Sequence, residues 1–225
     1  MNVAFFHVER DTQASQDAYV WARGLVQSIR RHMPGVGSVH LTDDTSRKVK
    51  GVDAVRRKPS EPMGLLRMRL CAGLRGSWLV LDTDVIIERD CQWVFDKWEF
   101  DIGVAKRNWD HLRPALGFSG RVPYNTGVLF SPCPDFFSEA YTRLRLLDDE
   151  QQHWMGEQTV MNDILNEERP RYAIKFLSGN MFNFPPPVKD QGAKLRLREI
   201  KKKVHITHYK GERRKAVLME RLKCA

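Results

Sequence analysis

The spacing of apolar residues along the chain predicts alternating strands and helices. Residues 3–8 have the composition of a strand, and residues 17–33 place apolar side chains on one face of a helix. Pro34 ends this helix, and short strands are expected at 36–42 and 52–56. A strand, a helix and a strand in this order predict a right-handed βαβ unit with parallel strands.

An unbroken apolar run, Trp78–Leu81, leads into the triplet Asp82, Thr83 and Asp84. Such a run is typical of a strand buried on both faces of a mostly parallel sheet. Since a carboxylate pair cannot lie inside that strand, we expect it at the carboxyl end, where α/β sheets place their ligand crevice. A divalent cation that offsets the repulsion of two carboxylates is the simplest explanation. The alternative is a strand end whose acids cap backbone groups or pair with arginine.

The rest of the chain continues this pattern as far as three consecutive prolines at 185–187. Expected in chain order are a helix at 64–75, a strand at 100–105, a long loop at 106–121 bordering a site, a strand at 124–130, and helices beginning near 135 and 156. The predicted fold class is therefore α/β, a single domain whose mostly parallel central sheet is flanked by helices.

Composition excludes several classes of protein. A hydrophobic share of 42% with 6 Trp and 11 Phe is enough for a sizeable core. Since no apolar run reaches about 18 residues, we expect no transmembrane segment. The first residues lack a basic region and a cleavage site, and the 4 Cys form no C-x-x-C pair. We therefore expect a cytoplasmic protein with reduced thiols.

The net charge of +9 is concentrated near the carboxyl terminus. Residues 194–215 carry ten Lys or Arg against Glu199 and Glu212, whereas residues 1–193 are neutral overall. We expect a core at 1–193 and a basic segment at 194–225. Its targets would be phosphates, an anionic surface or nucleic acid.

His208 stands in a context that suits a metal and phosphate site. Residues 204–208 alternate like a strand, and Gly211, Arg213 and Arg214 follow closely. Imidazole beside two carboxylates shifts the preferred ion from Mg²⁺ towards Mn²⁺. Glycine lets backbone approach an anion, and arginine offers paired donors to phosphate oxygens.

These motifs and their order resemble the retaining GT-A glycosyltransferases of the glycogenin and lipopolysaccharide galactosyltransferase type, and the resemblance runs from the first strand to about residue 214. The similar segments are the Arg-bearing helix at 66–70, the D-x-D at 81–85, Tyr-Asn-Thr-Gly-Val at 124–128, Gly-Glu-Gln at 156–158 with Asn-Asp-Ile-Leu at 162–165, Asn-Met-Phe-Asn-Phe at 180–184 and the His-x-x-Gly segment at 208–214. Three positions depart from the family: Glu157 replaces Asp, Arg214 replaces Lys, and Lys215-Ala216 replaces Pro-Trp.

The resemblance implies a hexosyltransferase that takes a hexose from a nucleotide-diphosphate sugar, most simply a UDP-sugar, with retention of configuration. The metal ligands for Mn²⁺ or Mg²⁺ would be Asp82, Asp84 and His208. Residues 7–9, which are His7, Val8 and Glu9, would face the base and ribose of the donor. The sugar would be lined by Arg67, Asn125, Gly127, Glu157 and Gln158, and the diphosphate would be bound by Gly211, Arg213 and Arg214. Thr83 and Thr126 would also bind the donor. Gln158 and Glu157 would be the catalytic residues.

The resemblance also implies an acceptor, which would be a saccharide, a glycolipid or a protein. Residues 194–215 would contact an anionic acceptor surface, and His208 to Arg214 would fold over the diphosphate as a lid. Nucleic acid is not the expected partner.

Two other functions compete with a transferase. Asp82-Thr83-Asp84-Val85 also fits the strand end of haloacid-dehalogenase-like phosphatases, in which the first Asp is the nucleophile. A non-enzymatic nucleic-acid binder would use the basic tail, but its acid pair would repel phosphate unless a metal were bound.

Overall fold

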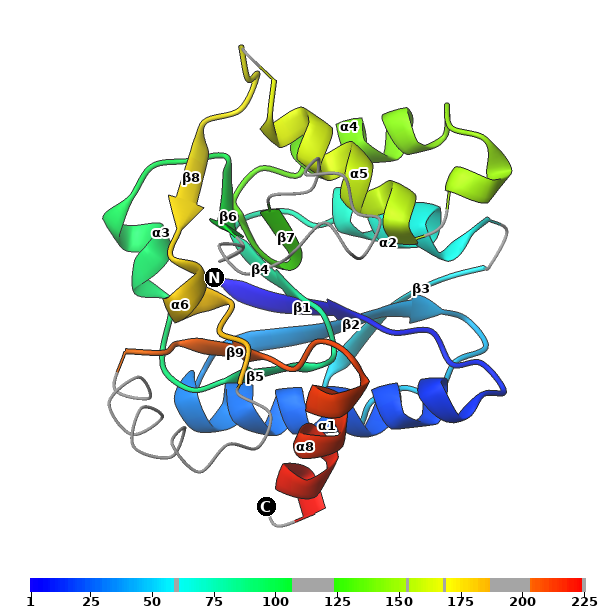
Figure 1. Ribbon diagram of the computed structural model, residues 1–225, viewed down its shortest axis with the longest axis vertical. Helices are drawn as coiled ribbons and strands as arrows, with labels where there is room; N and C mark the ends of the chain where they lie inside the picture. The colour runs from blue at the N-terminus through cyan, green and yellow to red at the C-terminus, as the bar shows by residue number, and fades with distance from the viewer. Residues whose placement is uncertain (59–60, 107–123, 153, 168, 187–202, 224–225) are drawn as a thin grey trace.

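The computed structural model of the chain describes residues 1–58, 61–106, 124–152, 154–167, 169–186 and 203–223 (Figure 1). Its centre is a seven-stranded sheet in the order β3-β2-β1-β4-β7-β6-β8. The strands are β1 (Asn2–Phe6), β2 (Gly37–Asp43), β3 (Asp53–Arg57), β4 (Trp78–Leu81), β6 (Ile102–Lys106), β7 (Tyr124–Ser131) and β8 (Ile174–Leu177). Strands β3, β2, β1 and β4 run parallel, as do β6 and β8, whereas β7 runs antiparallel to both of its neighbours.

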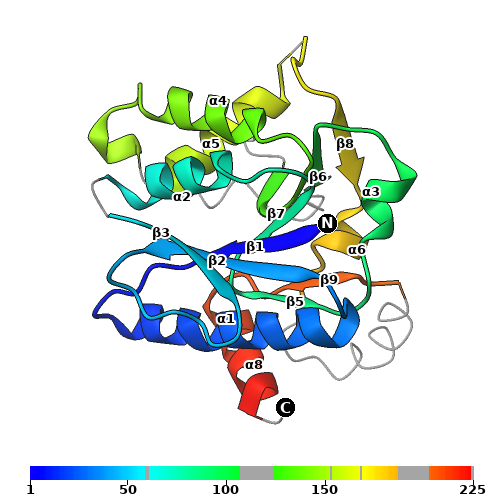
Figure 2. The ribbon, with the colours of Figure 1, turned by 180° about the vertical axis from the view of Figure 1, so that it is seen from behind.

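Helices cover both faces of this sheet (Figures 1 and 2). Helix α1 (Gln13–His32) lies on one face, and α2 (Met63–Ala72), α4 (Asp135–Leu144) and α5 (Trp154–Leu165) lie on the other. Because side chains alternate along a strand, Ala4 and Val80 enter the core under α2, α4 and α5, while Val3 and Leu79 enter the core under α1. The α/β fold class with a mostly parallel sheet is thus confirmed.

The first βαβ unit follows the sequence prediction, with shifted boundaries. Helix α1 begins four residues earlier than the apolar pattern indicates, because the Thr12 side chain accepts a hydrogen bond from the Ser15 backbone N–H at 3.2 Å. Strand β2 pairs parallel to β1, as expected for a right-handed crossover. The loop predicted at 106–121 lies almost entirely outside the described residues.

A segment from the middle of the chain and a segment near its carboxyl terminus meet in a second, two-stranded sheet. Strand β5 (Val85–Ile87) pairs antiparallel with β9 (Ile206–His208), and Val85 stands opposite His208. Helix α8 (Glu212–Lys223) then packs against α1. The tail therefore returns to the strand end that carries the acid pair.

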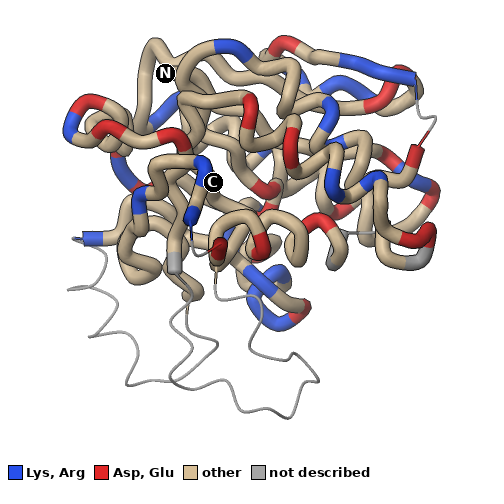
Figure 3. Tube along the Cα trace, turned by 90° about the horizontal axis from the view of Figure 1, so that it is seen from above, with Lys and Arg blue, Asp and Glu red and all other residues tan. Residues whose placement is uncertain are grey.

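Three short helical segments, α3 (Trp93–Lys97), η2 (Asp149–Gln151) and α6 (Gly179–Phe182), complete the described secondary structure. Basic and acidic residues are interspersed along most of the described chain (Figure 3). Among the described residues, no helix is long and apolar enough to cross a membrane.

Candidate active site

The acid pair lies in a tight turn between β4 and β5. The backbone N–H of Asp82 donates to the carbonyl of Gly127 at 2.9 Å, and the carbonyl of Asp84 accepts from the N–H of Tyr209 at 2.8 Å. The turn is therefore held by β7 on one side and by the tail on the other. It brings both carboxylates to one side of the chain, which an extended strand would not allow.

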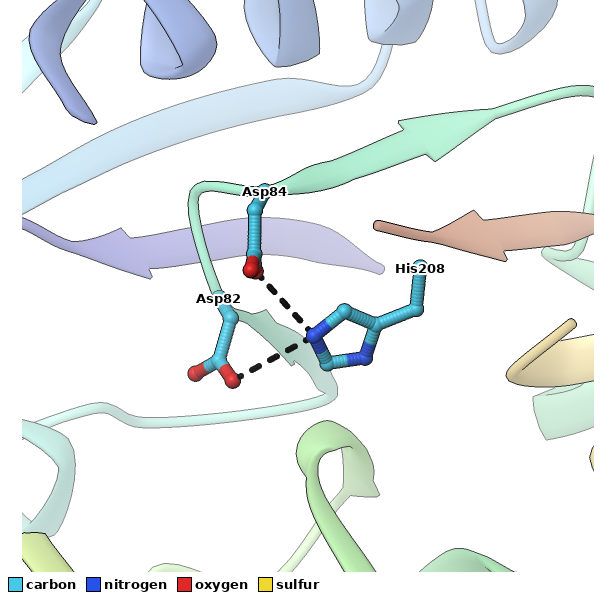
Figure 4. Close-up of side chains that lie close together, drawn as sticks. All are labelled: Asp82, Asp84 and His208. Atoms are coloured by element: carbon cyan, nitrogen blue, oxygen red, sulfur yellow. Dashed lines mark ion pairs between the residues drawn. The ribbon is translucent and has the colours of Figure 1, made fainter. Parts of the chain in front are cut away.

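His208 faces both carboxylates (Figure 4). Its Nε2 atom lies 3.0 Å from Oδ1 of Asp84 and 3.7 Å from Oδ2 of Asp82. The side chain of His208 is 2% exposed, whereas that of Asp82 is 34% exposed. The cluster therefore has a buried base and an accessible side.

Asn183 fixes the orientation of the His208 ring. The Nδ1 atom of His208 lies 3.0 Å from Oδ1 of Asn183, and the backbone N–H of His208 donates to the Phe184 carbonyl at 2.9 Å. Because an amide oxygen only accepts, this contact places a proton on Nδ1. The lone pair of a neutral ring is then on Nε2, the atom that faces Asp82 and Asp84.

These three side chains fit a divalent cation. Each residue offers one ligand atom, and these atoms all lie within 4.8 Å of one another. Burial alone would raise the pKa of Asp84, but His208, Lys215 and Lys210 outweigh it and hold that pKa below its ordinary value. Asp84 is therefore ionised at neutral pH, as a metal ligand must be.

Gly127 is required by the close approach of β7 to this cluster. A Cβ atom at position 127 would collide with the carboxylate of Asp82 and with the ring of His208. Asn125 supports the backbone of β7 at this point, since its side-chain oxygen accepts from the Gly127 N–H at 2.7 Å. Asn125 and Gly127 therefore shape the space next to the carboxylates.

A buried arginine links the acid pair to α5. Arg67 lies 3.0 Å from Asp82 and 3.0 Å from Glu157, and its side chain is 12% exposed. Burial raises the pKa of Glu157 to about 7, with Arg67 opposing the rise and Asp82 adding to it. Burial opposes a charge on Arg67, but the carboxylates of Glu157 and Asp82 outweigh it and raise the pKa of Arg67, so this arginine remains charged.

A pocket of about 560 Å³ opens beside these residues. The expected site residues that line it are Arg67, Asp82, Thr83, Asp84, Asn125, Thr126, Gly127, Glu157, Gln158, His208 and Gly211. The apolar residues of its lining are Phe6, Ala14, Ala18, Trp21 and Met63. A lining that combines ionised groups with apolar side chains suits a ligand that joins a charged part to a flat or apolar part.

Five expected donor-binding residues do not line this pocket. His7 is buried, with its Nε2 atom 3.2 Å from the carbonyl of Ser15, and Glu9 forms an ion pair with Arg47 at 3.0 Å. Val8 is part of the core. Arg213 is exposed, and Arg214 donates to the Pro186 carbonyl at 2.8 Å.

Four residues at the site carry no role in the sequence-based interpretation. Trp21, Lys210 and Lys215 line the pocket, and Asn183 orients His208. The sequence offered weak signals for two of them. Lys215 follows Gly211 by four residues, and Asn183 lies in the segment that resembles the glycosyltransferases.

No protein-family model and no curated protein sequence matches the chain. Solved structures do match it. The glycosyltransferase GlyE of Streptococcus pneumoniae TIGR4 shares 19% identity over 94% of this chain, with a TM-score of 0.62. The galactosyltransferase LgtC in complex with donor and acceptor sugar analogs shares 14% identity over 94% of this chain and 87% of its own, with a TM-score of 0.57.

A third match is a glycosyltransferase involved in glycosylation of the major capsid of PBCV-1. It shares 13% identity over 99% of this chain and 100% of its own, with a TM-score of 0.59. The chain spans only 54% of the GlyE structure. These matches show that the chain has the GT-A fold of glycosyltransferases, as its motifs predicted.

Proposed function

We propose that the chain is a glycosyltransferase that depends on a divalent metal and takes a hexose from a nucleotide-diphosphate sugar. The observation that carries the proposal is the convergence of Asp82, Asp84 and His208 in the lining of the pocket. Its support is the GT-A fold, which the chain shares with a galactosyltransferase solved with donor and acceptor sugar analogs.

The proposed metal is Mn²⁺, with Mg²⁺ as the alternative. Two carboxylates suit either ion, and the His208 imidazole favours Mn²⁺. When bound, such a cation offsets the charge that develops on a departing diphosphate. The chain's own part is to present the carboxylates of Asp82 and Asp84 and to direct Nε2 of His208 towards them through the contact of its Nδ1 atom with Asn183.

The sugar is proposed to lie between Arg67, Asn125, Glu157 and Gln158. These four side chains line the pocket and come from α2, β7 and α5. Hydrogen bonds from several fixed groups would orient the sugar so that its anomeric carbon faces the acceptor. Retention requires the acceptor to attack from the leaving-group face, or else a double displacement.

Glu157 and Gln158 are proposed as the residues nearest to the anomeric carbon. Glu157 is buried and paired with Arg67, so it is not a free base, and an amide such as Gln158 is too weak a base to accept a proton fully. Their proposed role is to orient the sugar and to stabilise charge on it, while the acceptor is a saccharide, a glycolipid or a protein.

The remaining predictions from the sequence concern the tail and the domains. A core at 1–193 and a basic segment at 194–225 stay proposals, as do contact of residues 194–215 with an anionic surface and a cytoplasmic location. Much of residues 194–215 lies outside the described part of the chain.

The geometry disfavours the competing phosphatase. Oδ1 of Asp82 is 3.0 Å from Arg67, and Oδ2 lies 3.7 Å from Nε2 of His208, on the side of the proposed metal. A phosphatase nucleophile needs a free oxygen aimed at the phosphorus atom. Among the described residues, the pocket lining also carries three carboxylates, Asp82, Asp84 and Glu157, which would repel a nucleic-acid backbone unless a metal were bound.

The test is release of free nucleoside diphosphate from a panel of UDP-, GDP- and dTDP-sugars, with Mn²⁺ and with EDTA. The proposal expects release from at least one donor with Mn²⁺ and its loss in EDTA. Release that persists unchanged in EDTA, or no release from any donor with saccharide acceptors present, would contradict it. Trapping of a phosphate on Asp82 by mass spectrometry would instead favour the phosphatase.

A further inference from the structure

The tail brings four cations close to the pocket, but they do not all point into it. Lys210, Arg213, Arg214 and Lys215 lie within six positions of one another around the start of α8. Of these four described residues, only Lys210 and Lys215 line the pocket. The run of basic residues in the sequence therefore does not show which of their side chains face Asp82 and Asp84.

Helix geometry explains this division. The backbone N–H of Lys215 donates to the carbonyl of Gly211 at 3.1 Å, so these residues stand one above the other on the same side of the first turn of α8. Gly211 lines the pocket, and Lys215 therefore lines it too. Arg213 comes two positions after Gly211 and points to another side. Arg214, whose backbone N–H also donates to the Gly211 carbonyl at 3.0 Å, starts near the same side, but its guanidinium turns away to the Pro186 carbonyl.

Two donors of Arg214 already bind backbone carbonyls. Its Nε atom donates to the carbonyl of Pro186 at 2.8 Å, and its Nη1 atom donates to the carbonyl of Lys210 at 3.4 Å. These bonds tie α8 to the segment that follows α6 and fix the start of the helix. Arg214 therefore has a structural role that competes with binding an anion.

Trp21 holds the Lys215 side chain at the pocket wall. The ammonium nitrogen of Lys215 lies 4.9 Å from the centre of the Trp21 ring, within the range of a cation–π contact. Trp21 is itself 6% exposed and packs against Ile86, Tyr209 and Leu218. Because the ring is fixed by its packing, it is a rigid support for the charge.

We infer that Lys215, supported by Trp21 and assisted by Lys210, binds the phosphates of a nucleoside diphosphate in this pocket, and that Arg213 and Arg214 do not. The start of α8 beside Gly211 favours the same anion, because the amino terminus of a helix carries partial positive charge. This inference rests on the proposed function, and it replaces the arginines of the sequence-based interpretation with residues that face the pocket.

The experiment is isothermal titration of UDP and of GDP into the full chain with Mn²⁺. Lys215→Ala and Lys215→Met are compared with Arg213→Ala and with Lys223→Ala, an exposed position at the far end of α8. The methionine variant keeps the stem packed on Trp21 while removing the charge. Loss of a charge-assisted contact should weaken nucleotide binding about ten-fold or more in both Lys215 variants, and not in the other two.

Binding of Mn²⁺ without nucleotide separates this role from damage to the acid cluster. Removing a positive charge near Asp84 should leave Mn²⁺ affinity unchanged or slightly higher in the Lys215 variants. Nucleotide affinity in both Lys215 variants equal to that of Lys223→Ala would overturn the inference and leave the proposed function standing. An equal loss in Arg213→Ala would overturn it in favour of the arginines.

A wild-type chain that binds neither nucleotide with Mn²⁺ would overturn the proposed function and the inference together.

Discussion

At the scale of single residues, the chemistry of the site depends on the proton at His208. Asn183 accepts from Nδ1, and the ring therefore presents Nε2 to Asp82 and Asp84. Groups that orient a ligating histidine in this way increase metal affinity by about ten- to a hundred-fold. The same interaction cannot be read from the sequence, because Asn183 and His208 are 25 residues apart.

Asn183→Ala should therefore weaken Mn²⁺ binding by about ten-fold or more, because the His208 ring loses the acceptor that fixes its tautomer. Asn183→Asp keeps an acceptor at the same place and should retain most of the affinity. Mn²⁺ affinity is measured by electron paramagnetic resonance of the free ion, and thermal melting without metal reports whether each variant folds. Equal affinities for the alanine variant and the wild type would refute the role of Asn183.

At the scale of secondary-structure elements, the tail that carries β9 and α8 completes the site. It can do so only when it is packed against the rest of the chain. Arg221 on α8 donates to both carboxylate oxygens of Glu88 at 2.6 and 3.1 Å, and also to the Tyr209 hydroxyl at 2.8 Å. Leu222 lies against α1 where Gly24 leaves room for it, since a Cβ atom there would collide with the leucine. Arg221 thus connects the segment after β5 to the residue that follows His208.

Arg221→Ala should loosen this docking, because one guanidinium bridges Glu88 and Tyr209. Amide hydrogen exchange across 203–215 should become faster, and Mn²⁺ affinity should fall because His208 is held less firmly. Lys223→Ala removes the same charge from the same helix and is the matched control. Exchange rates in Arg221→Ala that match the control would show that the ion pair does not dock the tail.

The pairing of β5 with β9 could not be predicted from the local sequence pattern. The acid turn after β4 and the Asn-Thr-Gly segment of β7 were predictable, because apolar runs next to polar triplets are local signals. The placement of His208 beside them depends on a strand pairing between residues about 120 positions apart, with Val85 opposite His208. Only the resemblance to a known family indicated it.

The direction in which a side chain points was harder to predict than the place of its residue in the fold. The sequence places Arg213, Arg214 and Lys215 side by side, and the residue that faces the pocket depends on where α8 begins. At the end of β1, Glu9 pairs with Arg47 instead of lining the pocket, because the segment after β2 turns back to meet it. Such pairings follow from packing of distant segments, which hydrophobic spacing does not encode.

At the scale of the whole molecule, two buried histidines couple stability to pH. His40 is 0% exposed and lies between Phe5 and His7, with ring centres 5.1 and 5.7 Å away. Burial lowers the pKa of His40 to about 4, although a hydrogen bond to the His7 carbonyl opposes the shift. Burial also lowers the pKa of His7.

The folded chain should therefore lose stability as the pH falls from about 6.5 to about 4, because the unfolded state takes up a proton that folded His40 resists. For His40 alone this amounts to roughly 3 kcal/mol, since each pKa unit is worth about 1.4 kcal/mol. The free energy of urea unfolding at pH 4.5 and pH 7 measures it. In His40→Gln the difference between the two pH values should be smaller by a comparable amount, and an unchanged difference would contradict the assignment.

The central claim is that Asp82, Asp84 and His208 form one binding site for a divalent cation. The most direct test is titration of Mn²⁺ into wild type and Asp84→Asn, followed by electron paramagnetic resonance in the presence and absence of UDP. We expect one bound ion per wild-type chain, and UDP should increase the affinity for that ion. In the variant, Mn²⁺ binding should be at least a hundred-fold weaker. A hundred-fold is about the upper limit for groups that only orient a ligand, so a larger loss indicates a direct ligand. Equal Mn²⁺ binding by wild type and Asp84→Asn, with both chains folded, would contradict it.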